Sequence, residues 1–294
     1  MRYLLTGSSG LLGSTFLTMS NHEVTCLSRA ELDAGQGDRL PGIVAGHRPD
    51  AVINCAAHVQ ADQAEDDPAP AREANVQLPG RLAGICRDLQ IPLVHFSSTG
   101  CYGNWKDGPY TEDDPLRPTT VHHTTKMEGE RIVRETNADH LILRTGWLFG
   151  GRPEHKRNFV WQRLLEAADR ATLTSDADQH GCPTLTDDVV AQTHHLLANG
   201  VRGTFNCVSA GAASRFDYVA KIVELFELPC RVVPGPAFAR RAPVSPNETA
   251  VNHRLGSIGM DRMPDWVSAL TRYRNEVCNW AEWKHLAGAR GGSR

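Results

Sequence analysis

Residues 3–13 read YLLTGSSGLLG, and this stretch decides the fold. Residues 3–6 are an apolar run of the kind that forms a buried strand, and residues 11–19 have the character of a helix. The turn between them carries three glycines at three-residue spacing. Such a turn admits a close backbone approach and leaves free N–H groups at the start of the helix, which a pyrophosphate requires. We therefore expect a dinucleotide to bind against the backbone of Gly7, Gly10, Leu11, Leu12 and Gly13.

Strands and helices alternate through the first half of the chain. The runs at 51–55 and 92–97 lack polar alternation, as strands buried on both faces require, and residues 72–89 between them have helical spacing. Further strands are expected at 23–28 and 141–144 and a further helix at 126–135. This order predicts an α/β fold with a Rossmann-type doubly wound parallel sheet.

After residue 150 the pattern becomes mixed. Helices are expected near 159–168, 187–198, 215–226 and 266–283, a strand at 204–208, and a proline-rich ordered loop at 234–246. We therefore divide the chain into an NAD(P)-binding domain at 1–150, a smaller mixed substrate-binding lobe at 151–285 and a disordered tail at 286–294. Elements of 178–210 are expected to pack back on the first domain.

The composition argues against a protein that binds nucleic acid or spans a membrane. In 294 residues, 40% are hydrophobic and 22% charged, and the formal net charge is −3. This charge gives no attraction to nucleic acid or to an anionic membrane, and no apolar run approaches the roughly 18 residues of a membrane span. A cytoplasmic protein with a small-molecule substrate is the expectation.

Cysteine and histidine spacing argues against a metal site. The eight cysteines include no C-x-x-C pair, and the adjacent histidines at 122–123 and 194–195 have no ligands at matching spacing. In a reducing compartment such cysteines behave as small buried hydrophobes.

The end of the second expected strand bears on the choice of dinucleotide. Ser28-Arg29 stands where an acidic residue would grip the ribose hydroxyls of NAD, and an arginine there suits a 2′-phosphate. NADP is therefore preferred, with NAD still possible; the alternative is that Arg29 is a solvated surface residue.

The motifs taken together resemble the extended short-chain dehydrogenase/reductase superfamily, and within it the dTDP-4-dehydrorhamnose reductase family. The resemblance runs from residue 1 to about 270. Its segments are TGSSGLLG, AVINCAAHVQADQAE, HFSSTGCYG, HHTTKMEGE, RTGWLFG, NFV and DQHGCPT.

The family's catalytic set is a Ser/Thr, a Tyr and a Lys four residues after the Tyr. By resemblance Ser98 and Lys126 fill two of these positions, while His122 stands in place of the tyrosine. A second departure is Thr99-Gly100, where the family has Asp-Tyr at the sugar pocket.

Histidine and tyrosine differ as proton donors. Carbonyl reduction needs a proton at the oxygen, and a neutral imidazole cannot easily supply one. His122 would have to be an imidazolium, whose pKa of about 6.5 the Lys126 cation lowers, so such an enzyme should work best below neutral pH. Alternatively His122 is a spectator, with the proton coming through Ser98, Tyr102, Cys101 or water, or it marks a lost reaction.

The resemblance also implies roles for several other residues. Asp33 is expected at the adenine, and Ala56 and Ala57 let the cofactor pass closely. His58, Ser98, Thr99, His122 and Trp147 are expected at the substrate, although His58 could be a satisfied pocket-wall residue and Trp147 a packing residue. Loops at 158–159 and 179–184 would close over the substrate, while Asp62 and Glu65 could simply cap a helix.

These expectations converge on an NAD(P)-dependent reductase acting on a keto group of a nucleotide-activated deoxysugar or a related small molecule. Two alternatives stay open: a catalytically silent or regulatory dinucleotide-binding subunit, and a redox-neutral epimerase or dehydratase of the same fold. A homodimer is one option for its assembly.

Overall fold

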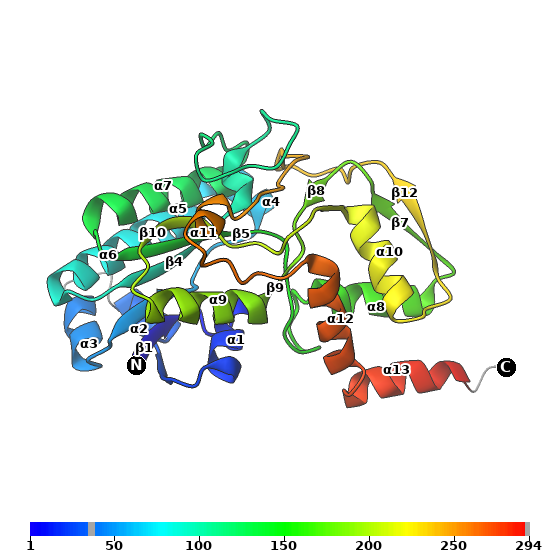
Figure 1. Ribbon diagram of the computed structural model, residues 1–294, viewed down its shortest axis with the longest axis horizontal. Coiled ribbons are helices and arrows are strands. Elements are labelled where there is room, and N and C mark those ends of the chain that lie inside the picture. Colours follow the sequence, from blue (N-terminus) through cyan, green and yellow to red (C-terminus); the bar gives the residue numbers. More distant parts are fainter. Residues whose placement is uncertain (35–38, 292–294) are drawn as a thin grey trace.

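A six-stranded parallel sheet forms the centre of the larger lobe of the protein (Figure 1). The computed structural model describes residues 1–34 and 39–291. The strand order is β10-β5-β4-β3-β1-β2. The strands are β1 (Arg2–Thr6), β2 (Glu23–Cys26), β3 (Ala51–Asn54), β4 (Leu93–Ser98), β5 (His140–Thr145) and β10 (Gly203–Asn206). The predicted Rossmann-type doubly wound fold is confirmed.

Both faces of this sheet are covered, which explains the unbroken apolar runs in its strands. Successive side chains of a strand point to opposite faces. Leu5 and Ile53 accordingly belong to one core cluster, and Leu4 and Val52 belong to another.

Helices supply the outer layers of the sheet. On the first face lie α1 (Leu11–Met19) and α9 (Thr186–Ala198), which are joined by a 3.0 Å hydrogen bond between the Thr15 and Thr186 hydroxyls. On the second face lie α3 (Leu40–Gly46), α6 (Leu78–Leu89) and α7 (Val121–Thr136). The edge strand β10 and the covering helix α9 both come from the second half of the sequence.

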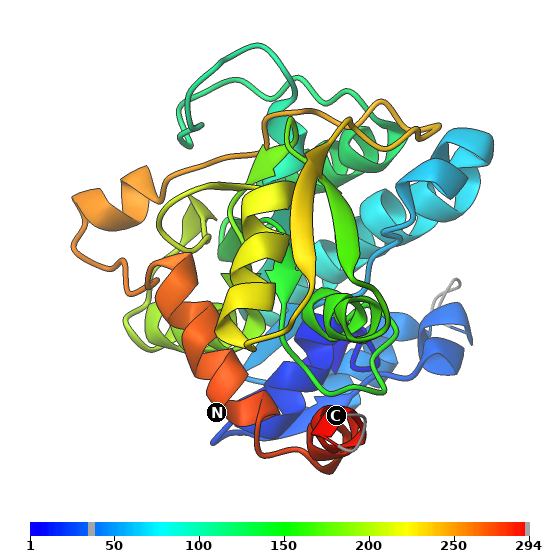
Figure 2. The ribbon, with the colours of Figure 1, turned by 90° about the vertical axis from the view of Figure 1, so that its right-hand side faces the viewer.

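The smaller lobe lies to the right in Figure 1 and faces the viewer in Figure 2. Strands β7 (Thr172–Asp176) and β12 (Arg231–Gly235) pair in parallel beside α8 (Phe159–Asp169) and α10 (Arg215–Leu225). Its core is aromatic, with Phe149, Trp161 and Tyr218 among the buried residues. Helix α12 (Trp266–Val277) packs into the same core.

Short elements connect the two lobes and complete the chain. The two-residue strands pair as β6 (Leu148–Phe149) with β9 (Thr184–Leu185), and β8 (His180–Gly181) with β11 (Ala213–Ser214). The remaining elements are α2 (Arg29–Ala34), α4 (Ala61–Asp66), α5 (Pro68–Arg72), η1 (Glu73–Gln77), η2 (Thr99–Tyr102), α11 (His253–Ser257) and α13 (Ala281–Gly291). Over the described ranges, none of the helices is both long and apolar enough to cross a membrane.

Three segments differ from the sequence-based expectation. The helix expected at 266–283 is divided, because α12 ends at Val277, the Trp280 N–H donates to the Val277 carbonyl oxygen in a tight turn, and α13 begins at Ala281. The helix expected at 72–89 is divided by the π-turn η1, which precedes Pro79 near the start of α6. Proline has no N–H to donate, so the regular ladder cannot continue through this point. The tail expected to be disordered from 286 is helical to Gly291, because Trp283 of α13 packs on Phe226 with ring centroids 4.9 Å apart. Residues 292–294 lie outside the described part of the chain.

Candidate active site

The glycine turn lies at the carboxyl edge of the parallel strands, and its glycines are required by close packing. Gly7 has a positive φ of 69°, and a Cβ atom there would lie 2.5 Å from the backbone nitrogen of Ala56. A Cβ atom on Gly13 would lie 2.2 Å from the Gly7 carbonyl oxygen. Gly10 is the N-cap of α1, and its N–H donates to that same oxygen at 2.9 Å. These contacts define a tight backbone turn, called here the glycine cradle, which is the feature that the predicted pyrophosphate contact would use.

A buried hydrogen-bond network fixes the neighbouring wall of the cradle. The Thr6 hydroxyl donates to Asn54 Oδ1 at 2.6 Å, which ties the ends of β1 and β3 together. The same Asn54 oxygen accepts from the backbone N–H of Ala56 at 3.2 Å. The backbone of Ala56 thus lies directly beside Gly7. The cofactor role of Ala56 and Ala57 stays a prediction.

Ser28 and Arg29 follow β2, and their side chains have different environments. The Ser28 hydroxyl and backbone N–H both bond Glu31 Oε2, at 2.6 and 2.7 Å, so Ser28 caps α2. These bonds lower the pKa of Glu31. Arg29 is exposed at the first residue of α2. The Asp33 side chain lies outside the described residues.

Ser98 and Lys126 meet at the end of β4. Ser98 is the last residue of the strand, is partly exposed, and accepts the Gly100 N–H at 3.1 Å. Lys126 is buried, and its Nζ donates to the carbonyl oxygen of Phe96 in the same strand. Burial lowers the pKa of Lys126, while Cys101 and Glu130 act in the opposite direction.

His122 lies on the first turn of α7 and is held neutral. Burial, followed by the charges of His123 and Lys126, lowers its pKa to about 3. Its Nδ1 atom is buried without a hydrogen-bond partner in the described structure. An imidazolium at this position is therefore strongly disfavoured at neutral pH, beyond the modest lowering expected from the Lys126 charge alone.

His123 was not among the predicted site residues, yet it shapes the pocket beside Ser98. Its Nδ1 and the Thr120 hydroxyl form a 3.1 Å hydrogen bond, and its backbone N–H donates to the same hydroxyl. A Cβ atom on Gly100 would fall 2.2 Å from the ring of His123. The signal in the sequence is the combination of a glycine two residues after Ser98 with a second histidine directly after His122.

The Thr99 side chain is not placed as expected for a substrate contact. Thr99 is 1% exposed, and its hydroxyl lies so close to Gly146 that a Cβ atom there would approach it to 2.5 Å. Thr99 is the first residue of the short helix η2, and its side chain is buried in the protein. Gly100 follows it in the same helix.

Two of the alternative proton donors, Tyr102 and Cys101, already make hydrogen bonds within the protein. The Tyr102 hydroxyl donates to Asn206 Oδ1 at 2.8 Å and accepts from Arg144, and burial raises its pKa to about 12. The Cys101 thiol donates to the His123 carbonyl oxygen, and burial raises its pKa to about 12 as well. Neither group can deliver a proton to a substrate at Ser98.

Asn75 is a second residue that the sequence analysis missed. It lies fully buried in η1, where its amide bonds both backbone groups of His58 at 2.9 and 3.0 Å. Its Nδ2 also donates to Thr125 Oγ1, which itself donates to the His122 carbonyl oxygen. Asn75 therefore connects the segment after β3 to the helix that carries His122 and Lys126.

Several contacts fix the position of the Trp147 ring, which the sequence analysis expects at the substrate. This residue has a positive φ of 45°, and its indole N–H donates to Glu248 Oε2 at 2.8 Å. A Cβ atom on Gly181 would clash with the ring at 2.3 Å, so Gly181 provides the space for it. The guanidinium of Arg215 covers the ring, with Cζ 3.5 Å from its centroid.

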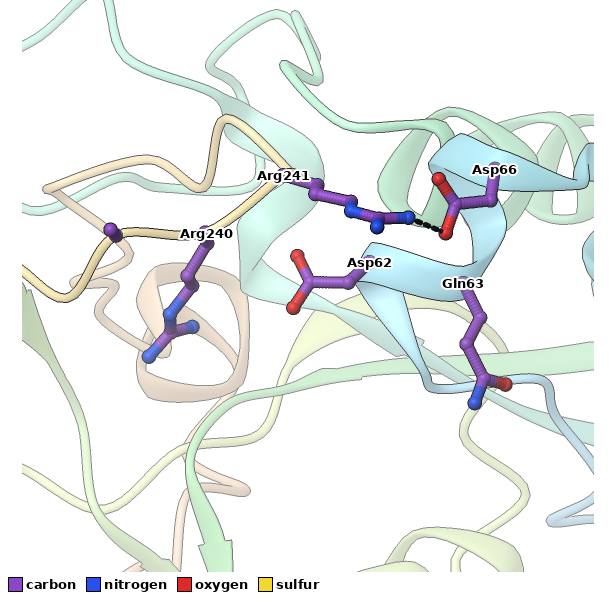
Figure 3. A pocket seen from close by; sticks show the side chains of 6 residues that line it. Asp62, Gln63, Asp66, Arg240 and Arg241 are labelled. Atoms are coloured by element: carbon purple, nitrogen blue, oxygen red, sulfur yellow. Dashed lines mark hydrogen bonds and ion pairs between the residues drawn. The ribbon is translucent and has the colours of Figure 1, made fainter.

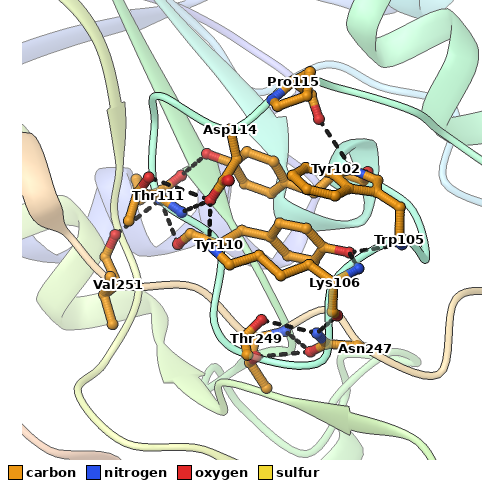
Figure 4. A network of polar contacts seen from close by, with 12 residues as sticks. Tyr102, Trp105, Lys106, Tyr110, Thr111, Asp114, Pro115, Asn247, Thr249 and Val251 are labelled. Atoms are coloured by element: carbon orange, nitrogen blue, oxygen red, sulfur yellow. Dashed lines mark hydrogen bonds and ion pairs between the residues drawn. The ribbon is translucent and has the colours of Figure 1, made fainter.

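The segment that carries Glu248 is held by an aromatic and polar network (Figure 4). Tyr102 and Tyr110 stack with centroids 4.8 Å apart, and the Tyr110 N–H donates to the Thr249 carbonyl oxygen. Asn247 donates to the carbonyl oxygens of Lys106 and Gly108 at 2.7 and 3.0 Å. These contacts hold the position of Glu248 relative to Ser98.

The other predicted residues, Asn158, Glu65 and Asp62, make hydrogen bonds that hold loops and helix ends in place. Asn158 caps α8 and donates to the Tyr273 hydroxyl at 2.7 Å, so it organises the loop from within. Glu65 caps α7 by accepting the Val121 N–H at 2.8 Å. Asp62 does not cap its own helix but accepts the N–H of Ala242 at 2.9 Å, beside the ion pair of Asp66 and Arg241 (Figure 3).

The positions of the His, Cys, Asp and Glu side chains in the described part of the chain do not form a metal site. Within residues 1–34 and 39–291, no group of at least three His, Cys, Asp or Glu side chains could hold an ion.

Comparison with known proteins identifies the family. Residues 1–279 match the family model described as the RmlD substrate binding domain. A dTDP-4-dehydrorhamnose reductase from Streptomyces griseus is 35% identical over 95% of each chain. A probable dTDP-4,6-dihydroxy-2-methyloxan-3-one 4-ketoreductase from Streptomyces antibioticus is 33% identical, over 92% of this chain and 93% of that one.

A solved structure shows the same architecture. The dTDP-4-dehydrorhamnose reductase of Bacillus anthracis, in complex with NADP, aligns with a TM-score of 0.89 and 25% identity. The alignment covers 94% of this chain and 99% of that chain. The glycine cradle, the placement of Ser98 and Lys126 and these similarities over nearly the whole length lead to one conclusion: this chain belongs to the RmlD substrate-binding-domain family of extended short-chain dehydrogenases/reductases.

Proposed function

We propose that this protein is an NADPH-dependent reductase of a keto group in a dTDP-activated deoxysugar. The observation that carries the proposal is that Lys126 of α7 bonds the backbone of β4, the strand that ends at Ser98, at the same sheet edge as the glycine turn after β1. The relatives with names of this activity, similar over more than nine-tenths of the chain, support the substrate class.

The residues present fit the cofactor. The backbone of the cradle would hold the pyrophosphate, Arg29 the 2′-phosphate and Lys126 the nicotinamide ribose. Ser28 would support Arg29 by capping α2, because its hydroxyl and its backbone N–H are both bonded to Glu31. Bound NADPH supplies hydride to the carbonyl carbon. NADP in a structure of similar architecture supports the choice over NAD.

The proton must be provided by this chain's residues or by solvent. Ser98 is partly exposed, and its hydroxyl would donate a hydrogen bond to the carbonyl oxygen of a bound substrate. A neutral His122 cannot act as an acid by simple ionisation, but it can accept a proton on one ring nitrogen as it releases one from the other. We therefore assign His122 to a neutral relay between Ser98 and water.

A specific observation keeps the catalytically silent alternative in place. Burial of His122 leaves no ready acid at the tyrosine position, as a subunit that only binds dinucleotide would tolerate. The two functions differ in turnover: both bind NADPH, but only the reductase consumes it when a dTDP-4-keto-6-deoxysugar is added.

The test is a fluorescence titration with NADPH and NADH, followed by turnover with dTDP-4-keto-6-deoxyglucose. The reductase proposal expects micromolar NADPH binding, weaker NADH binding and substrate-dependent oxidation of NADPH. Binding without turnover would favour the silent subunit, and failure of both dinucleotides at millimolar concentration would remove the proposal. His122→Tyr is the informative variant, since it restores the family's acid.

We also propose a cytoplasmic location. All eight cysteines are free thiols in the structure, which is the state that a reducing compartment maintains.

A further inference from the structure

Ser98 and His123 come from different elements, and both contact Gly100. Ser98 Oγ accepts the Gly100 N–H at 3.1 Å. The imidazole of His123 fills the space into which a side chain at Gly100 would project, since a Cβ atom there would lie 2.2 Å from Nε2 of the ring. The ring of His123 is therefore placed next to the hydroxyl of Ser98, the group that the proposed function assigns to the keto oxygen.

The contacts of Thr120 determine which ring nitrogen of His123 carries the proton. The Thr120 hydroxyl accepts the backbone N–H of His123 and lies 3.1 Å from Nδ1 of the ring. Thr120 is 2% exposed, and in the described part of the chain Nδ1 is the only acceptor bonded to this hydroxyl. The hydroxyl has a single hydrogen, which it therefore donates to Nδ1. A neutral imidazole whose Nδ1 is unprotonated carries its proton on Nε2.

Two effects keep this imidazole neutral. Burial is the largest and lowers the pKa of His123, while the charge of Glu248 raises it and that of Lys126 lowers it. His123 is also the third residue of α7, where the positive end of the helix dipole disfavours an imidazolium. A neutral histidine at a helix N-terminus can polarise a carbonyl group by donating a hydrogen bond without giving up its proton.

The Nε2 atom of His123 is left for a ligand. Across the described residues it forms no hydrogen bond, yet it is not a fully buried atom, unlike Nδ1 of His122. The two rings are neighbours, with centroids 4.8 Å apart. Of the two imidazoles, His123 is thus the one with a fixed tautomer and an unpartnered donor beside Ser98.

We propose that His123 is a catalytic residue whose Nε2–H donates a hydrogen bond to the keto oxygen, together with the hydroxyl of Ser98. As hydride adds to the carbonyl carbon, the electron pair of the C=O bond moves to the oxygen, and the two donors stabilise the charge that develops there. His123 keeps its proton. The proton that completes the product comes from water through the relay assigned to His122. This inference rests on the proposed function, because the keto group belongs to the substrate class proposed above.

Two amide variants separate the donor from the ring. The amide nitrogen of a glutamine reaches the position of Nε2, whereas that of an asparagine reaches only the position of Nδ1. His123→Asn should therefore lower kcat with dTDP-4-keto-6-deoxyglucose roughly 100- to 1,000-fold, and His123→Gln should recover at least roughly tenfold of this loss. Calorimetry should show unchanged binding of thymidine diphosphate (dTDP) to the NADP⁺-saturated variants, because dTDP has no keto group.

His140→Asn is the matched control. His140 also bonds through Nδ1, to the Asn137 carbonyl oxygen at 2.7 Å. It begins β5 and pairs with Leu93, the first residue of β4, at the opposite end of the strand from Ser98. Its replacement should leave kcat unchanged.

A second measurement requires no change in the folded protein. The ¹⁵N NMR spectrum of the histidine-labelled wild type at pH 7 should show His123 as the Nε2–H tautomer, with the signal assigned by its loss in His123→Gln. An Nδ1–H tautomer would overturn the inference. If thermal denaturation shows that both variants are unfolded, this spectrum still decides the outcome.

The kinetic outcomes separate this inference from the proposed function. A kcat of wild-type size in His123→Asn, or equal losses in the Asn and Gln variants, would overturn the role of His123 as a donor. Turnover of the keto sugar by the wild type would leave the reductase proposal standing in that case. A wild-type protein that oxidises no NADPH with the keto sugar would overturn both.

Discussion

The imidazole of His123 occupies the space into which a side chain at Gly100 would project. A Cβ atom on Gly100 would lie 2.2 Å from both Nε2 and Cε1 of the ring. The hydroxyl of Thr120 holds the ring and the backbone of His123 together. The glycine of the Thr99-Gly100 departure is therefore matched to the ring of His123 on α7.

Gly100→Ala should destabilise the protein by about 1–3 kcal/mol, because the ring of His123 cannot move without breaking its bond to Thr120. Urea denaturation measures the change. Gly108→Ala is the control: no atom lies within 4 Å of the added Cβ there, and its effect should stay within about 0.5 kcal/mol. Adding His123→Ala to Gly100→Ala should cost less than the sum of the single changes; full additivity would contradict the packing argument.

The rate of NADPH oxidation should change little between pH 8 and 6. With its pKa lowered to about 3, His122 stays neutral across this range, so no imidazolium acid forms. Initial rates at saturating keto sugar provide the measurement. A tenfold rise as the pH falls from 8 to 6 would show instead that substrate binding raises the pKa of His122 into that range and that it acts as an imidazolium.

The free energy of unfolding should decrease as the pH falls from 7 toward 4. His194 stacks on Tyr3, and burial lowers its pKa to about 4. Between this value and about 6.5 the unfolded chain binds a proton that the folded protein does not, which favours unfolding. His194→Phe keeps the ring contacts and should reduce the acid sensitivity. His47→Gln, at an exposed position, should leave it as in the wild type, and equal slopes in all three proteins would refute the assignment.

Asn75→Ala should lower the stability by about 2–4 kcal/mol, because it leaves the backbone N–H and C=O of His58 without their partner. The rate of turnover should also fall, since Thr125 on α7 loses its contact with η1. Asn279→Ala removes an exposed amide that bonds only its own helix region, and it should change neither quantity. A stable, fully active Asn75→Ala protein would show that η1 does not position the site.

Arg29→Ser should weaken NADPH binding roughly 10- to 100-fold while NADH binding stays nearly constant, because only NADPH carries a 2′-phosphate. Fluorescence titration with each dinucleotide measures the ratio. The exposed Arg87→Ser provides a charge-matched comparison on α6. Equal weakening of NADPH and NADH would place Arg29 outside the 2′-phosphate contact.

Much of the cofactor half could be predicted because its signals are local. The apolar strands and the glycine spacing follow from short segments whose backbone geometry depends on their own residues, whereas Ser98 and Lys126 are predicted only through the family resemblance. The break at η1 could also have been anticipated from Pro79, whereas the ordered end of α13 depends on Trp283 reaching Phe226 from a distant segment.

The sequence by itself determined the Rossmann fold and the glycine turn after its first strand, because periodicity and glycine turns act through neighbouring residues. Only the tertiary structure decided the protonation of His122, the inward turn of Thr99 and the stacking of Arg215 on Trp147. These properties depend on burial and on contacts between residues far apart in the chain. A low-dielectric environment and a close packing partner exist only once the chain has folded.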